Sequence, residues 1–356
     1  QKALGQVALD VLDASKTLAA INGGIEADQD SAPGRLHFGA SIAGEECSRK
    51  LWYGHHWVKA QRHGARLLRL FARGETEEVR FVNYLRRAGV TVWEVDPDTN
   101  QQWRISDHAG HFGGSLDGMG IGVPDAPDEP HVLEFKTHNA KSFGDMVKRG
   151  VLESKPQHYT QMQIYMSKMD VQWALYMAVN KNDDDLYLER VPLDAAHAQR
   201  MLDRARRIIA SDRPLERMSD DPSWFKCKWC DYYDICHGTD TPAMNCRTCA
   251  HATPMMDGDG RWHCDKFDKH LDAAMQRTGC DDHNFIPPLL ANWAEPIDAD
   301  DDGVTYTNKI NGKEFTNSHG RYSSAEIAAA APELIGDAQV DRLKFEFDAR
   351  LTGVGR

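Results

Sequence analysis

The spacing of apolar residues predicts helices on either side of a strand-rich middle region. A repeat near 3.6 residues predicts helices over residues 1 to about 24, about 44–87 with an interruption near Gly74, 139–168 and 193–210. Short β-prone runs between turn residues predict an antiparallel meander at 90–137 and a strand pair at 171–180 and 185–193. A hairpin with an Asn-Gly turn, followed by one or two helices, is expected after residue 303.

This order of elements predicts an α/β protein with several parts. The main domain should be a small mixed sheet flanked by helices, and a Cys-rich module without clear periodicity should follow it. The expected segments are a helical segment at 1–40, the main domain at 41–240, the module at 241–290, and an acidic linker with a small α/β tail at 291–356.

Composition narrows the class of protein. With 356 residues, 41% hydrophobic and 27% charged, an ordinary globular core is expected. No apolar run approaches the ~20 residues that span a membrane, and the first residues lack the pattern of a signal peptide, so a cytoplasmic location is expected. The net charge of -12 argues against a passive coat on nucleic acid, but not against an enzyme with a local basic strip.

Two acidic residues and a lysine form the strongest candidate site. Asp117 lies near the end of a predicted strand, and Glu134 and Lys136 alternate with Phe135 in HVLEFK, so the two charged side chains should share one face. Glu134 follows Asp117 by 17 residues, which suits neighbouring strands of a hairpin. Carboxylates and the Phe135 carbonyl are ligands that Mg²⁺ prefers, and Lys136 could orient or deprotonate a water. An isolated Glu-x-Lys on a strand, however, is usually a solvated face.

The wider pattern resembles a known family. Asp, Glu-x-Lys and a following helix with Gln-x-x-x-Tyr resemble the PD-(D/E)XK nucleases, in particular the RecB-like and YqaJ (lambda-exonuclease-like) branch, over residues 40–240. Gln161 and Tyr165 occupy the helix positions, and Gln163 is an alternative for the glutamine. Leu116 replaces the proline of the nominal motif, which slightly weakens the match.

The resemblance implies a Mg²⁺- or Mn²⁺-dependent DNA nuclease with a restriction-endonuclease-like core. Glu78, with Glu77 as the alternative, would be a further metal ligand beside Asp117, Glu134 and the Phe135 carbonyl. Lys136 would act on the water, and Gln161 would steady the lysine or the substrate. Exonuclease action on DNA ends in phage-type recombination, replication or DNA processing is favoured, with a recombination or single-strand-binding protein as a partner.

Other functions stay open at this point. The chain could be a CRISPR-adaptation-like nuclease that trims DNA ends. It could also be a non-catalytic DNA-binding or assembly module on a nuclease fold, or a zinc-organised interaction protein in which the Glu-x-Lys is accidental. A complete acidic set with its lysine argues against the non-catalytic alternatives. The sequence does not decide cleavage polarity, strand preference or oligomeric state.

All eight cysteines are expected to bind metal rather than form disulfides. The first set is a C-x2-C-x5-C string and one distant residue, Cys47, Cys227, Cys230 and Cys236. This split resembles the iron–sulfur nucleases of the AddB type, in which a [4Fe–4S] cluster staples the two ends of the domain. A four-cysteine zinc site is the alternative, and Cys47 could also be a simple buried thiol.

The second set has the spacing C-x2-C-x14-C-x15-C and comprises Cys246, Cys249, Cys264 and Cys280. A knuckle followed by two further thiols favours a structural zinc site. His251, His263 and His283 lie close in sequence and could each replace a ligand. A different division of the cysteines between the two sites is also open.

Basic residues at helical spacing predict a surface for DNA phosphates. They are Arg62, Arg66, Arg69 and Arg73. A second group comprises Arg200, Arg204, Arg206 and Arg207. A plain solvated helix face is an equally good interpretation of each. Trp52, Tyr53 and Trp57 lie near the first group, where core packing is favoured over base stacking. The acidic run 298–303 lacks the glutamate of a calcium loop and is interpreted as linker.

Overall fold

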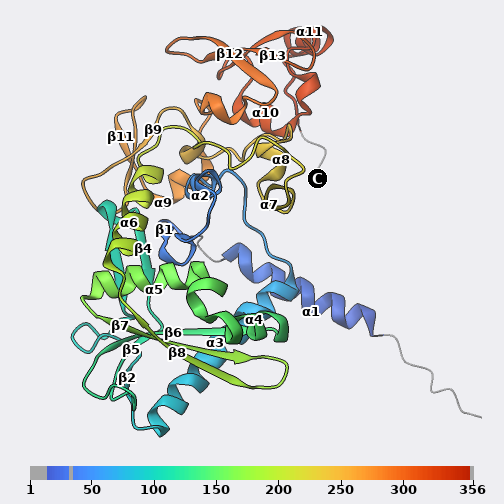
Figure 1. Ribbon diagram of the computed structural model, residues 1–356. Coiled ribbons are helices and arrows are strands. Elements are labelled where there is room, and N and C mark those ends of the chain that lie inside the picture. The colour runs from blue at the N-terminus through green and yellow to red at the C-terminus, as the bar shows by residue number, and fades with distance from the viewer. Residues whose placement is uncertain (1–13, 32–34, 353–356) are drawn as a thin grey trace, which may run out of the picture.

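A five-stranded mixed sheet organises the larger part of the chain in a computed structural model that describes residues 14–31 and 35–352 (Figure 1). Its order is β2-β5-β6-β7-β8, with β6 and β7 parallel and the other neighbours antiparallel. The strands are β2 (Thr91–Trp93), β5 (Gly118–Ile121), β6 (His131–His138), β7 (Trp173–Asn180) and β8 (Leu186–Pro192). The expected mixed α/β fold is therefore confirmed.

Helices cover both faces of this sheet. On one face, Phe81 and Leu85 of α3 (Ala65–Arg87) pack against Phe135 and the other odd-numbered residues of β6 and β7. The opposite face carries Val132 and Tyr176. It packs against α4 (Ala140–Ser154) and α5 (Pro156–Met169), with α6 (Ala195–Ile209) beyond α5. Since strand neighbours point to opposite faces, Glu134 projects toward the α4–α5 side.

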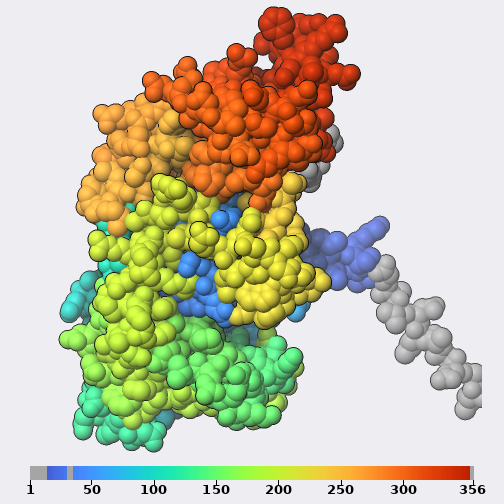
Figure 2. All heavy atoms as spheres, turned by 45° about the horizontal axis from the view of Figure 1, so that its top comes forward, coloured from blue at the N-terminus to red at the C-terminus, as the bar shows by residue number. Residues whose placement is uncertain are grey.

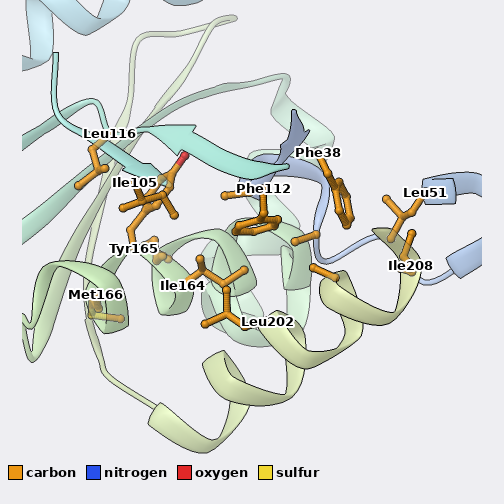
Figure 3. Close-up of a cluster of buried hydrophobic side chains, with 14 of the residues drawn as sticks. Phe38, Leu51, Ile105, Phe112, Leu116, Ile164, Tyr165, Met166, Leu202 and Ile208 are labelled. Atoms are coloured by element: carbon orange, nitrogen blue, oxygen red, sulfur yellow. The ribbon is translucent and has the colours of Figure 1, made fainter. Parts of the chain in front are cut away.

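A second, three-stranded sheet lies beside α5. It contains β1 (Phe38–Gly39), β4 (Phe112–Ser115) and β3 (Arg104–Asp107), with β1 parallel and β3 antiparallel to the central β4. Side chains from this sheet, α5, α6 and α2 (Ser48–His55) share one apolar core, in which Phe112 and Tyr165 are central (Figure 3). This sheet holds the segment that runs directly into Asp117.

Small elements make up the remainder of the chain. The cysteine-rich region forms a sheet of β9 (Ala252–Pro254), β10 (Trp262–Cys264) and β11 (Lys269–Leu271), while the last region forms a sheet of β12 (Ala294–Ala299), β13 (Val304–Asn308) and β14 (Glu314–Asn317). The short helices are α7 (Phe225–Lys228), α8 (Tyr233–Cys236), α9 (Ala273–Thr278), α10 (Ser324–Ala329) and α11 (Ala338–Phe347). Figure 2 shows these C-terminal regions side by side at one end of the molecule.

Three expectations about the elements were wrong. Helix α3 continues through Gly74, and the break lies instead at residues 56–64, before the helix begins. Residues 90–137 are not one meander, because β3 and β4 leave the main sheet to pair with each other and with β1. The acidic stretch near 297–303 is not a linker throughout, since β12 pairs with β13 as an edge strand with exposed side chains.

Other expected helices differ in their bounds. The predicted helix 139–168 is two helices, because Lys155 before Pro156 has a non-helical backbone (φ -137°, ψ 58°), and the first helix is also kinked at Gly150, which has a φ of 71°. The N-terminal helix is described only as α1 (Ser15–Ala27), and the earlier part of that prediction lies outside the described residues. Among residues 14–31 and 35–352, no helix combines the length and apolar character needed to cross a membrane.

Candidate active site

Strand pairing brings Asp117 opposite Glu134. Gly118 at the start of β5 pairs with Leu133 of β6, which places the preceding Asp117 beside Glu134. The backbone N–H of Phe135 donates to Asp117 Oδ2 at 2.7 Å. This hydrogen bond continues the ladder through a side chain, so the position of Asp117 is tied to the backbone of the Glu-x-Lys strand.

Glu134 is a fully buried carboxylate with a single close donor. It is 0% exposed, and the Lys136 ammonium forms an ion pair with it. Among the described residues, no other donor forms a hydrogen bond with either of its oxygens. The Lys136 ammonium also donates to the Phe135 carbonyl at 3.1 Å. Three carboxylates beside one ammonium leave an excess of buried negative charge, which is costly, so this site favours binding of a cation.

Helix α3 supplies the third carboxylate. Glu78 is half-buried and lies near enough to Asp117 and Lys136 for their charges to act on it. Its neighbour Glu77 points elsewhere, because both of its oxygens accept hydrogen bonds from Arg80 at 2.9 Å. The geometry thus places Glu78, rather than Glu77, with the other acidic residues.

The pKa values reflect crowding of like charges. Burial, followed by the charge of Asp117, raises the pKa of Glu78 to about 7. Burial also raises the pKa of Glu134 to about 7, although Lys136 opposes the shift. Burial alone would lower the pKa of Lys136, but the charges of Glu134 and Asp117 outweigh it and raise this pKa. Lys136 is therefore a cation at neutral pH, suited to orient water and stabilise negative charge rather than to accept a proton.

The residues predicted on α5 lie beside this site. Gln161 Nε2 donates to the Tyr165 hydroxyl at 3.4 Å, and that hydroxyl donates to the Ser115 carbonyl at 2.9 Å. Burial, and then the charge of Glu134, raises the pKa of Tyr165. The alternative residue, Gln163, is committed elsewhere, since its amide bridges the Pro192 carbonyl and the Asp194 N–H.

Three residues that the sequence did not single out also adjoin the site. Tyr176 pairs with Glu134 across β6 and β7, and its hydroxyl is hydrogen-bonded to His138 Nε2 at 2.8 Å and to His158 Nδ1 at 2.9 Å. Burial lowers the pKa of His138 to about 4 and of His158 to about 3, so both are neutral. The strand alternation 134, 136, 138 could have indicated His138, whereas the other two depend on tertiary packing.

Each predicted cysteine set lines its own cavity. Cys47 from the start of α2 and three cysteines from 227–236 surround a cavity of about 280 Å³. Its charged lining comprises the cations Arg49, Lys50, Arg217 and Lys226 and the carboxylates Glu45 and Glu46. The second set surrounds a smaller cavity of about 20 Å³. All eight cysteines are free thiols.

The side chains are nevertheless not arranged as formed metal sites. Within the described ranges, no three His, Cys, Asp or Glu side chains are arranged as ligands around a common metal position. The cysteine and acidic groups thus share cavities or faces without standing at ligand positions.

The histidines near the second set are engaged in other contacts. His283 Nε2 is hydrogen-bonded to the Asn245 carbonyl at 2.9 Å, and His251 Nε2 to the Asn284 amide at 3.2 Å. His263 precedes Cys264 on β10 and therefore faces the other side of the strand. The four cysteines line the cavity together with His251, His283 and Asp282.

The predicted basic surface is only partly helical. Arg66, Arg69 and Arg73 are exposed on α3, with Arg69 bonded to Asn22 and Arg73 to the Lys181 carbonyl, whereas Arg62 precedes the helix. In the second group, Arg204 is bonded to two backbone carbonyls and a serine near α2 and is not available to phosphate. Trp52 and Tyr53 are buried core residues.

The fold and site thus define a mixed α/β protein with a buried carboxylate–lysine cluster.

No family model and no curated protein matches the chain. Similar solved structures include LHK-Exo in complex with dAMP, at 21% identity over 49% of this chain and 87% of that chain, with a TM-score of 0.37. Another structure, the alkaline exonuclease LHK-Exo from Laribacter hongkongensis, has 19% identity, coverages of 54% and 91%, and a TM-score of 0.36. SSO0001 has 14% identity, coverages of 62% and 96%, and a TM-score of 0.38. These values are too low to assign a function.

Proposed function

We propose that this chain is a metal-dependent DNA nuclease of the PD-(D/E)XK type, with exonuclease action favoured. The observation that carries the proposal is the buried Glu134, which has Lys136 as its one donor among the described residues and lies with Asp117 and Glu78 at one end of the β5–β6 pair. A binding module has no need of three mutually repelling carboxylates, whereas phosphodiester hydrolysis needs them to hold a hard cation.

Glu78, Asp117, Glu134 and the Phe135 carbonyl would hold Mg²⁺ or Mn²⁺. When bound, such an ion supplies Lewis-acid polarisation of the scissile phosphate and a water of lowered pKa. The oxygen-only donor set suits these hard cations. The raised pKa values of Glu78 and Glu134 fit the same role, because neutralising their repulsion favours the deprotonated forms.

Lys136 would position the attacking water and stabilise charge on the phosphate as a permanent cation. Its ammonium is already fixed between Glu134 and the Phe135 carbonyl, so it needs no further ordering. Gln161 would steady the substrate or the lysine. Tyr165 would act on the acidic site indirectly, by holding the Ser115 carbonyl two residues before Asp117.

End-labelled linear DNA, single- and double-stranded, tests the proposal with Mg²⁺, Mn²⁺ or EDTA. Metal-dependent shortening is expected for the native chain, with loss of about three orders of magnitude or more in Glu134→Ala and Lys136→Ala. Glu77→Gln is the matched control, since Glu77 bonds to Arg80 instead of facing the site, and should keep activity. Folded protein that binds DNA without cutting it in any of these conditions would replace the nuclease by a binding module.

We propose further that the first cysteine set binds a [4Fe–4S] cluster. Its cavity of about 280 Å³ is the larger of the two. Of the four cations that line it, Lys50 and Lys226 are paired with Glu45 and Glu46, which also line it. A four-thiolate iron–sulfur cluster carries net negative charge, which Arg49 and Arg217 would stabilise. Because Cys47 precedes the main sheet and Cys227 follows it, the cluster would join the two ends of the domain.

The second set, by contrast, is proposed to bind one Zn²⁺ through four thiolates. The cavity of about 20 Å³ has room for about one small ion. Burial and mutual repulsion raise the pKa of Cys246 and of Cys249 to about 11, an unfavourable setting for thiolates that a cation would reverse. Iron and zinc analysis after anaerobic purification tests both assignments: Cys230→Ser should lose iron alone, and Cys249→Ser zinc alone. Zinc at the first set, or neither metal, would contradict them.

A further inference from the structure

We infer that the cysteine module, residues 245–285, is a brace that holds Asp117 in position. Zinc bound in the module would therefore strengthen the affinity of the acidic site for its own metal ion. The inference deepens the proposed function and rests on it. The module touches the acidic site nowhere directly. Instead it forms hydrogen bonds with residues 109–111, the turn before β4, which is the strand that leads to Asp117.

The module has too little apolar core to keep its own shape. Its buried hydrophobic cluster consists of Trp262, Cys264 and Leu271, and each of its strands is three residues long. Regions this small are ordinarily held by a metal or disulfides. Cys264 lies on the central strand β10, so a zinc–thiolate bond there would fix the β9–β10 hairpin relative to the 246–249 knuckle.

One anchor to the main domain lies inside the knuckle itself. Arg247, between Cys246 and Cys249, is 1% exposed and donates to the carbonyls of His55 at 2.9 Å and Leu36 at 2.8 Å. Its guanidinium also lies 3.7 Å from the centre of the Trp57 ring. A buried guanidinium bonded to carbonyls tolerates little movement, so the knuckle and the main domain are positioned together.

The second anchor is the tip of the β9–β10 hairpin. The Met255 carbonyl is hydrogen-bonded to His111 Nε2 at 2.8 Å, and the Gly260 N–H donates to the Ala109 carbonyl at 2.6 Å. The two backbones are so close that a Cβ on Gly110 would lie 2.5 Å from the Gly260 nitrogen. The hairpin tip therefore fixes residues 109–111 directly.

Every residue between this turn and the acidic site lies in an extended segment that is hydrogen-bonded to its neighbours. Residues Phe112–Ser115 are the central strand β4, which pairs with β1 and β3. Leu116 is fully buried and its N–H donates to the Trp103 carbonyl at 3.0 Å. Asp117 follows immediately. A shift of the turn would thus pass along an extended, hydrogen-bonded segment to the Asp117 carboxylate.

Two variants distinguish the effect of losing zinc from the effect of losing the contact between the hairpin tip and residues 109–111. Cys264→Ser should lose zinc, while Gly260→Ala should keep zinc but push the hairpin tip away from the turn, since a Cβ on Gly260 would lie 2.8 Å from the Gly110 carbonyl oxygen. In both, hydrogen exchange of the amides of 112–117 should speed up about tenfold, and Mn²⁺ affinity at the acidic site, measured by electron paramagnetic resonance, should weaken about tenfold. Met256→Ala at the same hairpin tip is the control, because its side chain is 46% exposed.

Unchanged exchange at 112–117 and unchanged Mn²⁺ affinity in Gly260→Ala would overturn the brace. If Cys264→Ser does not fold, zinc release from the native chain by a mercurial reagent gives the same comparison. A native chain that binds no Mn²⁺ would instead count against the nuclease proposal, and the exchange of 112–117 would still decide whether the module braces the strand.

Discussion

Three carboxylates confined beside one lysine dominate the energetics at the scale of single residues. Asp117, Glu134 and Glu78 repel one another, and the Lys136 charge partly offsets this repulsion in the absence of metal. This repulsion lowers the stability of the metal-free protein, as is common at functional sites. The consequences can be tested one residue at a time.

Removing one charge should stabilise the metal-free protein while it abolishes cleavage. Glu78→Gln is expected to raise the melting temperature in EDTA at pH 8 by roughly 2–4 °C, because repulsion from Asp117 is relieved. Glu77→Gln is the neighbour control and should lower the melting temperature, since it loses the Arg80 pair. Calorimetry on both variants, with a cleavage assay beside it, measures the contrast. A fall in melting temperature for Glu78→Gln would contradict the crowding argument.

Magnesium should stabilise the protein more at high pH than at low pH. The folded-state pKa values of Glu78 and Glu134 are raised to about 7, so these groups contribute stability below about pH 4.5 that is lost as the pH rises through 7. Bound Mg²⁺ replaces the protons and restores that stability. The increase in melting temperature on adding Mg²⁺ should therefore be larger at pH 8 than at pH 5.5. An equal increase at both values would exclude these carboxylates as its ligands.

At the scale of elements, the contact between β4 and α5 sets the position of the acidic site. Gly114 on β4 leaves no room for a side chain, because a Cβ there would lie 2.6 Å from the Tyr165 hydroxyl and 3.0 Å from the Ala40 Cβ. The same hydroxyl holds the Ser115 carbonyl. Close approach of strand and helix thus requires a glycine at this point.

Gly114→Ala should destabilise the fold by about 1–3 kcal/mol in urea unfolding, since β4 must move away from α5. Gly144→Ala is the matched control: this glycine lies in α4 with nothing within 4 Å of its Cβ, and the change should stabilise by about 0.5–1 kcal/mol. Adding Tyr165→Phe to Gly114→Ala should recover part of the loss because it removes the clashing oxygen. A neutral Gly114→Ala would show that β4 can shift freely.

At the scale of the whole molecule, buried neutral histidines should make the fold sensitive to acid. His56 is 2% exposed, stacks on Trp52 at 3.7 Å and lies beside Trp262, so it sits where the cysteine module meets the main domain. Burial lowers its pKa to about 3. Its contribution to stability is complete above the unfolded pKa of 6.5 and is lost as the pH falls from 6.5 toward 3.

His56→Phe should therefore flatten the pH dependence of stability. Between pH 7.5 and 5.0 the native chain should lose about 2 kcal/mol more unfolding free energy than the variant, at about 1.4 kcal/mol for each unit below 6.5. Urea unfolding at the two pH values measures the difference. Parallel losses in both proteins would mean that His56 is protonated in the folded state.

The sequence by itself determined the local features. Alternation within HVLEFK placed Glu134 and Lys136 on one face, and apolar periodicity located α6 and the strands β6 to β8. For α3 it indicated a helix but put a break near Gly74, where the helix is continuous. Turn chemistry indicated the β13–β14 hairpin. These features depend on neighbours in the chain, which is why a single sequence reveals them. The mixed α/β class followed from their order.

Tertiary structure decided whatever depends on distant partners. Only packing distinguished Glu78 from Glu77 and Gln161 from Gln163. In each pair the second side chain forms hydrogen bonds away from the site, Glu77 with Arg80 and Gln163 with the Pro192 carbonyl, and the sequence does not reveal these bonds. Strand pairing moved β3 and β4 out of the expected meander. The contact between the cysteine module and the turn before β4 joins residues about 150 positions apart through backbone groups and the His111 ring, and no local sequence pattern indicates such a pairing.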